Sequence, residues 1–511
     1  MCGKLCFLLF AICLAKNATL GNPTHCHRDP YLYTGTKTPY SYVHNNTGES
    51  MAVANCMPMQ IWMLCRHGTR YPDELTIARI LNLTQIRDRV MANKSETQNT
   101  RQCERKDLKN WKPHSELVPE KGKHLAMQGE KDLMSLAERL KAKLPMLFDE
   151  NVIKKFKFRS TGTQRTIASM SFFMKGAFGN RSEIESLNNI SLQFESMNMQ
   201  QTATYFLEDV SNDTSIIELE VVPTANDTLL KMYDSCESWK NVGVNKEVDA
   251  FINGAEMARI FANVSRRLDL ANISKGKLLN NINFQLVTQH PLSFTTHQLF
   301  IQIKSIVNCK LLIMASEDAF LFYDACRFER AWNPDESSPW CDVFTNNEMQ
   351  VFEYEEDLFY YYRSGPGEKI NGELGCHPIR DMFDHFTKLE SVKDGDEPRG
   401  VFYFTHSHMI GMFLTAMGVG KDSVPLTTAN FRDMYRRNWR SSLLMPFTAN
   451  FAAVFHRCDS NDTPFKVAFY LNENPLTLED CENGVCDWIQ LKEKLGGIAV
   501  NCSMEVCQKK S

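Results

Sequence analysis

The chain has 511 residues, 43% of them hydrophobic and 23% charged, which is typical of a soluble globular protein and suits one large core plus an insertion. Its formal net charge of −4 excludes a general attraction to nucleic acid or to acidic membrane surfaces. A negatively charged ligand would therefore have to be held by a local cluster of basic side chains.

Residues 1–15 are predicted to form a signal peptide. Lys4 precedes a short apolar run, and residues 13–15 offer small side chains for cleavage. The run is shorter than the roughly 20 residues of a membrane-spanning helix, and no later segment is apolar enough, so we expect no transmembrane segment. The C-terminus is not a retention signal of the Lys-Asp-Glu-Leu type. We therefore expect a secreted, extracellular protein rather than one kept in the endoplasmic reticulum lumen or a lysosome-like compartment.

The cysteines also indicate an oxidising compartment. Of the 17 cysteines, 14 follow Cys13, and Asn-x-Ser/Thr sequons recur along the chain, so we expect disulfides and a glycosylated surface. Close spacing predicts the pairs Cys481–Cys486, Cys326–Cys341 and Cys502–Cys507, while the remaining connectivity stays open. A zinc site is the rival interpretation, but no Cys-x-x-Cys or Cys-x-x-His pair occurs, so we expect no metal site.

The main motif follows an extended lead-in at residues 22–58. An apolar strand at 61–65 runs into the sequence Arg66-His67-Gly68-Thr69-Arg70-Tyr71-Pro72, and a helix is predicted at 73–92. Sheets of the α/β class present ligand-binding groups at the carboxyl ends of their strands. Guanidinium groups match phosphate oxygens, and a neutral imidazole between them can act as a nucleophile. The motif therefore predicts a phosphoryl site.

A second strand–turn–helix unit follows a polar loop at 93–121 and an amphipathic helix at 122–148. A short strand at 156–158 runs into the segment 159–166, which contains two arginines, and a helix is predicted at 167–178.

Residues 180–374 are predicted to be a mostly α-helical insertion that caps the sheet domain, with helices at 252–308 and 346–363. Arg363 and Lys369 near its end are candidate contacts for a polyanionic substrate, although a solvated face explains them equally well.

The third unit is a strand at 401–405, the turn His406-Ser407-His408 and a helix at 409–418. Beyond it we predict two neighbouring antiparallel strands and a short helix, at residues 450–457, 465–471 and 487–495.

The heptapeptide 66–72 resembles the Arg-His-Gly-x-Arg-x-Pro signature of the histidine acid phosphatases, and its Thr-Arg-Tyr-Pro ending is closest to the inositol polyphosphate phosphatases, a phytase-like branch. Residues 159–166 resemble the family's Arg-Ser-Thr-x-x-x-Arg-Thr segment. With this resemblance we predict an α/β fold: a sheet domain with helices on both faces, formed by residues 22–179 and 375–511, plus the mostly α-helical cap insertion.

The resemblance also implies roles for individual residues. His67 would be the nucleophile that forms a phosphohistidine, and His406 would hydrogen-bond the phosphate. The phosphate-binding side chains would be Arg66, Arg70 and Arg165. Arg159 would be an orienting neighbour or a substrate contact, and Lys369 is a possible substrate contact. No metal or cofactor is implied, because the arginines supply the positive charge.

The pattern breaks at the proton donor. Most histidine acid phosphatases have Asp directly after the motif histidine, and the inositol polyphosphate branch has Glu two places after it; here these positions hold Ser407 and His408. Three interpretations stay open. A protonated His408 donates below its ordinary pKa of about 6.5, a carboxyl group from elsewhere substitutes, or catalysis is feeble.

Three functions are therefore compared. The leading one is a secreted, metal-independent phosphomonoesterase acting on inositol polyphosphates such as phytate, with 2,3-bisphosphoglycerate as a further substrate that the resemblance implies. The alternatives are a catalytically weak binder of phosphorylated ligands and a broad-specificity acid phosphatase.

Overall fold

The computed structural model describes residues 33–44, 51–92, 108–148, 154–179, 203–208, 215–242, 246–268, 317–391, 397–479, 481 and 484–508. The predicted signal peptide, much of the predicted loop at 93–121 and the predicted helix beyond residue 268 lie outside the described residues. None of the helices in the described ranges is both long and apolar enough to cross a membrane.

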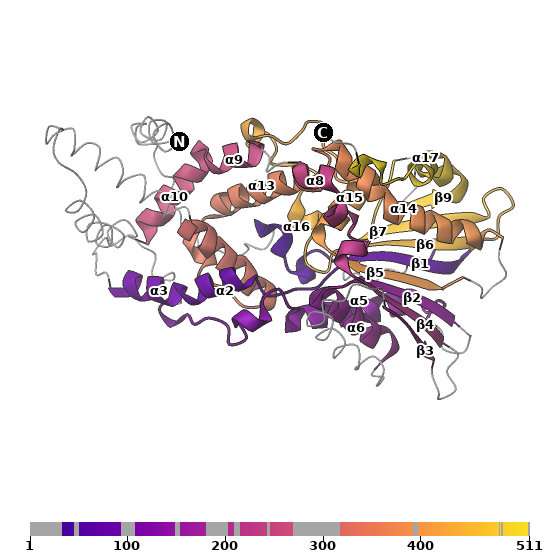
Figure 1. The fold of residues 1–511 in the computed structure, drawn as a ribbon, viewed down its shortest axis with the longest axis horizontal. Coiled ribbons are helices and arrows are strands. Elements are labelled where there is room, and N and C mark those ends of the chain that lie inside the picture. Colours follow the sequence, from indigo (N-terminus) through magenta and orange to yellow (C-terminus); the bar gives the residue numbers. More distant parts are fainter. Residues whose placement is uncertain are drawn as a thin grey trace.

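One mixed sheet organises the described part of the chain (Figure 1). Its order is β3-β4-β2-β5-β1-β6-β7-β8, and β9 pairs with β7. The neighbours β4, β2, β5 and β1 pair parallel with one another. β3 pairs antiparallel with β4, and each strand beyond β1 pairs antiparallel with its neighbour. The bounds are β1 Cys56–Arg66, β2 Lys154–Thr161, β3 Ala203–Glu208, β4 Ser215–Val222, β5 Gly400–Thr405, β6 Asn450–Cys458, β7 Phe465–Leu471, β8 Asn474–Pro475 and β9 Val485–Asp487.

Helices cover both faces of this sheet. The side chains of β1 alternate between two cores, because successive residues of a strand point to opposite faces. Ile61 and Met63 join the core under α5 (Met127–Lys143) and α6 (Gln164–Phe178). Trp62 and Leu64 join the core under α14 (Lys369–Leu389), α15 (Ser407–Ala416) and α17 (Trp488–Val500). Because β1 is buried on both faces, residues 61–65 form a continuous apolar run in the sequence rather than an alternating pattern.

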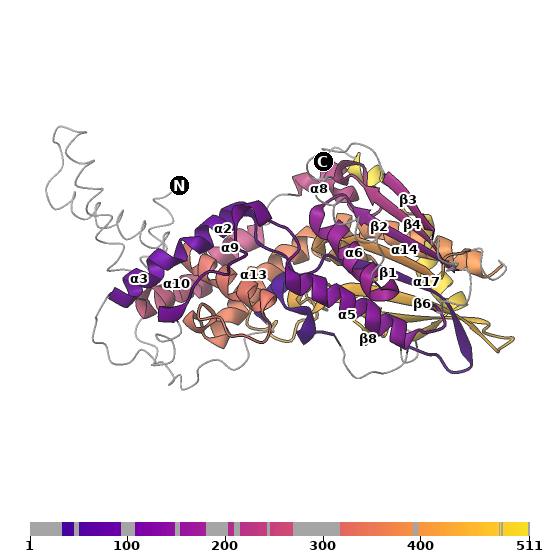
Figure 2. The same ribbon diagram turned by 90° about the horizontal axis from the view of Figure 1, so that it is seen from below.

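A mostly helical region lies at one end of the sheet domain, and both views show it (Figures 1 and 2). Residues 317–332 are helical there as well. The named helices of this region are α2 Glu74–Leu81, α3 Leu83–Ala92, α9 Lys246–Ile252, α10 Ala255–Arg267 and α13 Asn346–Arg363. The helix α13 begins at a capping box in which Thr345 and Glu348 satisfy each other's backbone N–H groups. The predicted α/β class with a helical cap is confirmed.

Residues 180–374 are nevertheless not all cap. The strands β3 and β4 fall in this range and extend the central sheet, with β4 parallel to β2. Conversely, α2 and α3 come from the range 22–179 but lie beside α10 and α13 (Figures 1 and 2). The polar composition of residues 180–250 hid the alternation of apolar and acidic residues in β4, where Ile217, Leu219 and Val221 are buried.

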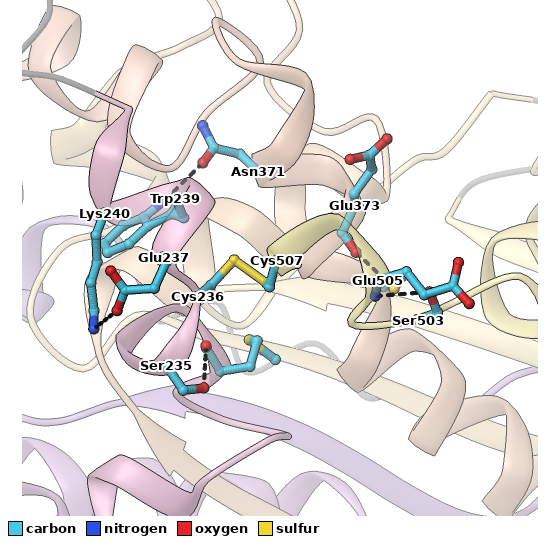
Figure 3. The surroundings of a disulfide bond; sticks show 12 residues. Ser235, Cys236, Glu237, Trp239, Lys240, Asn371, Glu373, Ser503, Glu505 and Cys507 are labelled. Carbon is cyan, nitrogen blue, oxygen red and sulfur yellow. Dashed lines mark hydrogen bonds and ion pairs between the residues drawn. A yellow bond between two sulfur atoms is a disulfide. The ribbon is translucent and has the colours of Figure 1, made fainter. Parts of the chain in front are cut away.

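Five disulfides join described cysteines: Cys56–Cys458, Cys236–Cys507, Cys326–Cys341, Cys376–Cys502 and Cys481–Cys486. Two predicted pairs are confirmed, but the predicted pair Cys502–Cys507 is wrong. Cys502 meets α14, whereas Cys507 meets Cys236 at the start of α8 (Glu237–Asn241), as Figure 3 shows. Tertiary packing, not spacing along the chain, sets these two partners.

Candidate active site

Three parallel strands end at the same place, and each end carries a polar side chain. Arg66 is the last residue of β1 and stands opposite Thr405, the last residue of β5. Thr161 ends the next strand, β2, and His406 follows β5 directly. The His67 and His406 ring centroids are 5.6 Å apart. The carboxyl edge of the sheet therefore assembles groups from three distant segments, as parallel strands of this class do.

The backbone holds His67 on both sides. Its N–H donates to the Thr405 carbonyl over 2.9 Å, and its carbonyl accepts from the Thr448 N–H over 3.2 Å. The segment before β6 and the end of β5 thereby fix the turn, and the His67 residue is only 3% exposed.

Gly68 is needed for packing at this turn. A Cβ atom there would lie 2.8 Å from the Gly129 backbone of α5, closer than Cβ atoms approach. The Gly68 N–H donates over 3.0 Å to Ser169 Oγ, which donates over 2.6 Å to the Arg165 carbonyl. Ser169 therefore ties the main motif to the first turns of α6. Sequence reasoning missed Ser169, because nothing in its local pattern marks it.

The tautomer of His67 follows from its contacts. Its Nδ1 lies 2.9 Å from the Gly68 carbonyl oxygen, which can only accept, so Nδ1 carries the proton and Nε2 the lone pair. Burial, followed by the charges of Arg66 and Arg165, holds the His67 pKa well below its ordinary value. The ring is therefore neutral under acidic conditions, as a nucleophile must be.

Arg165 meets His406. The Arg165 Nη2 donates to His406 Nδ1 over 3.3 Å, and His406 Nε2 lies 3.0 Å from Thr161 Oγ1. Since the Thr161 hydroxyl donates to Thr166, it accepts from His406, which fixes the neutral Nε2–H tautomer. Burial and then the Arg165 charge keep the His406 pKa well below its ordinary value.

Arg66 and Arg70 complete the cationic cluster. Arg66 Nη1 donates to the carbonyls of Thr36 and Met445, over 2.5 and 2.7 Å, and the guanidinium lies 4.6 Å from the Phe447 ring centroid. Burial lowers the Arg66 pKa to about 10, which still leaves the side chain charged. The Arg70 charge lowers the pKa of both Arg66 and His67. The structure thus brings together Arg66, His67, Arg70, Arg165 and His406.

A second buried ion cluster borders Arg66. Glu356 of α13 accepts from Thr36 over 2.5 Å and from Lys37 over 2.8 Å, and it pairs with Arg327. Arg327 and then Lys37 outweigh the burial penalty and lower the Glu356 pKa to about 2. Sequence reasoning missed this cluster, because Thr36 and Lys37 lie 320 and 319 residues from Glu356 and no motif joins them.

His408 does not have the properties expected of an acid. Burial, followed by the charges of Arg363 and Arg66, lowers its pKa to about 3. The expectation that His408 is protonated just below pH 6.5 is therefore wrong. An imidazolium ion is unfavourable here because the side chain is buried and other cations lie nearby.

Two predicted substrate contacts lie elsewhere. Arg159 donates to Glu220 over 3.1 Å and to the buried Asp227 over 2.8 Å, so its guanidinium is committed to structural ion pairs. The Lys369 side chain is 91% exposed and pairs with Glu373 on α14. It lines a surface hollow of about 480 Å³ beside the Cys376–Cys502 disulfide, not the histidine cluster.

One group of potential metal ligands occurs in the described ranges: Cys376, His377 and Cys502. The two sulfur atoms are joined in a disulfide, so they cannot serve as thiolate ligands in this state.

Comparison with known proteins agrees with this geometry. Residues 59–472 match the histidine phosphatase superfamily (branch 2). The chain belongs to this family, and it is a phosphatase of the histidine type. Its relatives include multiple inositol polyphosphate phosphatase 1 of Drosophila melanogaster, which is 30% identical over 482 residues, covering 93% of this chain and 87% of the relative. The human protein of the same name is 25% identical, covering 94% of this chain and 86% of that protein.

Solved structures share the fold. The phytase from D. castellii superposes with a TM-score of 0.63 at 17% identity, covering 96% of this chain and 91% of that one. A multiple inositol polyphosphate phosphatase from Bifidobacterium longum, in complex with inositol hexasulfate, superposes with a TM-score of 0.58 at 15% identity, covering 91% and 98%.

Proposed function

We propose that this protein is a secreted, metal-independent phosphomonoesterase that removes phosphate from inositol polyphosphates through a phosphohistidine at His67. The observation that carries the proposal is the neutral imidazole of His67, with its lone pair on Nε2, inside a cluster of three arginines. The names of the relatives support the substrate class. 2,3-Bisphosphoglycerate is a further candidate substrate.

The reaction has two steps. Nε2 of His67 attacks phosphorus and the bond to the leaving oxygen breaks, while Arg66, Arg70 and Arg165 hold the phosphoryl oxygens. Water then attacks the phosphohistidine, the N–P electron pair returns to Nε2, and phosphate and a proton leave. His406 Nδ1, which carries the lone pair, accepts a hydrogen bond from a protonated phosphoryl oxygen once Arg165 turns from His406 to the substrate.

Secretion is supported by the N-terminal sequence, the sequons and the disulfides. The test is to express the full chain in a eukaryotic cell and assay the medium and the cell lysate for the protein and its glycans. Recovery only in the lysate without glycans would contradict this part of the proposal.

The catalytic part is tested with purified protein. Inositol hexakisphosphate and p-nitrophenyl phosphate are incubated across pH 4–8 with a chelator present. We expect phosphate release from both substrates and a trapped phosphohistidine. His67→Ala should abolish both signals, a loss of at least about 10³-fold.

Tight binding of inositol hexakisphosphate without turnover would instead favour a catalytically weak binder of phosphorylated ligands. The specific argument for that alternative is the lowered pKa of His408. A strong preference for diverse small aryl esters, with no binding of the inositol ester, would favour a broad acid phosphatase.

A further inference from the structure

Two side chains of α13 show which face of this helix meets the candidate active site. Glu356 accepts from the Thr36 hydroxyl, and the Thr36 carbonyl in turn accepts from Arg66. One helical turn later, the Tyr360 hydroxyl and Ser407 Oγ lie 3.1 Å apart and hydrogen-bond to each other. This face of α13 therefore reaches both the main motif and the turn that follows β5.

Glu355 lies at the edge of the same face of α13. It stands one helical turn before Phe359, and side chains four residues apart on a helix are neighbours. The Phe359 ring packs near His408, with the two ring centroids 6.3 Å apart. His408 occupies the position where the inositol polyphosphate branch has its glutamate. A carboxyl group therefore comes from the cap helix to the side of the site where the sequence pattern lacks one.

Glu355 shares its charged neighbours with the residues of the site. Arg327 acts on the pKa of both Glu355 and Arg70. Lys37 acts on the pKa of both Glu355 and His408. These shared neighbours place Glu355 at the border of the cationic cluster. The charged groups that face it are Glu356 of α13 itself, Arg327 and Asp324 of the helix at 317–332, and Lys37 of the segment before β1.

The two adjacent glutamates of α13 differ in protonation. Burial, followed by the negative charge of Glu356, raises the pKa of Glu355 to about 7 against the opposing charges of Arg327 and Lys37. The same two cations pair directly with Glu356 and lower its pKa to about 2. Where two neighbouring carboxyl groups have pKa values that are pushed apart, one is an anion and the other can serve as an acid.

The Glu355 carboxyl is also open to a ligand. The pKa is about 7 for four carboxyl groups in the described ranges, and three of them accept hydrogen bonds from fixed neighbours: Asp132, Glu329 and Glu353. Glu355 is the fourth. It makes no hydrogen bond or ion pair with another described residue, and its side chain is partly exposed rather than sealed in the protein.

Two further carboxyl groups near the histidines are paired with cations. Asp234 pairs over 2.7 Å with Lys231, whose charge acts on the pKa of His406. Asp324 pairs with Arg327 over 2.6 Å. Because an ion pair favours the ionised form of a carboxyl group, these two are poor sources of a proton.

We propose that Glu355 is the general acid of this site, and that it protonates the leaving oxygen of a phosphate ester directly or through one water. The proposal rests on the proposed function, because it needs phosphoryl transfer to His67. Glu355 would supply the acid that is missing at positions 407 and 408. A positioned general acid contributes about 10²–10⁴-fold when the leaving group is a poor one, as an alkoxide is.

The proton balance closes over the two steps of the reaction. As Nε2 of His67 attacks phosphorus, the P–O bond to the alcohol breaks with its electron pair on oxygen, and that oxygen takes the Glu355 proton. The Glu355 carboxylate then takes a proton from the water that attacks the phosphohistidine. The N–P electron pair returns to Nε2 and phosphate leaves, so both side chains are back in their starting states without a co-reactant.

The test compares substrates whose leaving groups need an acid to different degrees. Inositol hexakisphosphate and glycerol phosphate release alcohols, whereas p-nitrophenyl phosphate releases a stable phenolate. Glu355→Gln keeps the size of the side chain but removes the acid. We expect kcat to fall at least about 10²-fold with both alcohol esters and to change less than about threefold with p-nitrophenyl phosphate. The matched control is Glu373→Gln on α14, whose carboxyl pairs with the exposed Lys369 and should leave all three rates within about twofold.

A second measurement needs no variant. For the wild-type protein, kcat is measured with glycerol phosphate and with p-nitrophenyl phosphate, which are both monoesters, from pH 5 to 9. The ratio of the first kcat to the second should be constant in acid and should fall by about tenfold per pH unit above the Glu355 pKa of about 7, because only the protonated carboxyl donates. Glu355→Gln should remove this dependence.

The outcomes separate the two proposals. Equal losses with alcohol and phenol esters, or undiminished turnover of inositol hexakisphosphate by Glu355→Gln, would overturn the role of Glu355 and leave the phosphohistidine mechanism intact. A wild-type ratio that does not change with pH would overturn it as well, even if the variant failed to fold. Absence of a phosphohistidine with every substrate would overturn the proposed function and the role of Glu355 with it.

Discussion

Arginines surround His67 in the candidate active site, whereas aromatic rings surround His408. The same residue type serves differently in these two surroundings. His67 is neutral with its lone pair on Nε2, which suits a nucleophile. His408 is also neutral, and there neutrality removes the property that an acid needs. The comparison teaches that a strong cationic field favours nucleophilic histidines and disfavours proton-donating ones, unless a carboxyl group is added.

The largest expected effect that sharpens this contrast comes from Arg165. Arg165→Ala removes one donor to the phosphoryl oxygens and the partner of His406 Nδ1. Loss of one such donor costs about 10²–10³-fold in kcat. The measurement is kcat and KM with p-nitrophenyl phosphate. The matched control is Lys369→Ala, which removes an exposed cation distant from the histidines and should leave both constants within about twofold. Equal losses in the two variants would refute the convergence of Arg165 on His67.

Ser169 tests how the turn at His67 is positioned. Ser169→Ala leaves the buried Gly68 N–H without its acceptor, which costs about 1–3 kcal/mol of stability. We expect a fall of about tenfold in kcat with a smaller change in KM, since a displaced turn misaligns the nucleophile more than it weakens binding. Stopped-flow turnover and urea unfolding measure the two effects. Ser169→Thr keeps the hydroxyl and should recover most of the activity; if Ala and Thr variants behave alike, the hydroxyl is not what aligns the turn.

The last prediction concerns the pH dependence of stability at His408. The unfolded state protonates His408 near its ordinary pKa of about 6.5, whereas the folded state does so near 3. The unfolded state therefore binds more protons between these values, and the contribution of His408 to stability is full above pH 6.5 and declines as the pH falls toward 3. The slope is at most about 1.4 kcal/mol per pH unit for one proton. Urea midpoints of wild type and His408→Gln, compared between pH 7 and 4, isolate this group. We expect the variant to lose less stability on acidification; parallel curves would show that His408 titrates normally.

The sequence alone was enough to predict the elements that carry the site. The apolar run before Arg66, the helix at 346–363 and the strand before His406 all match observed elements, because their periodicity and turn chemistry are local. The two short-loop disulfides were also accessible for this reason. The strands β3 and β4 were missed because a polar neighbourhood masked a short alternating pattern, and Cys502 and Cys507 were mispaired because their partners lie far away in sequence.

The local sequence thus determined which side chains are presented at the ends of the strands, since a strand, a polar turn and a helix are encoded by neighbouring residues. Only the tertiary structure decided what each presented group meets. It places Arg159 and Glu356 in ion pairs, Ser169 beneath the motif turn and His408 among four aromatic rings, those of Tyr233, Trp239, Phe359 and Tyr360. The physical reason is that burial and the charges of distant residues set the protonation and the partners of a side chain, and those distances exist only once the chain has folded.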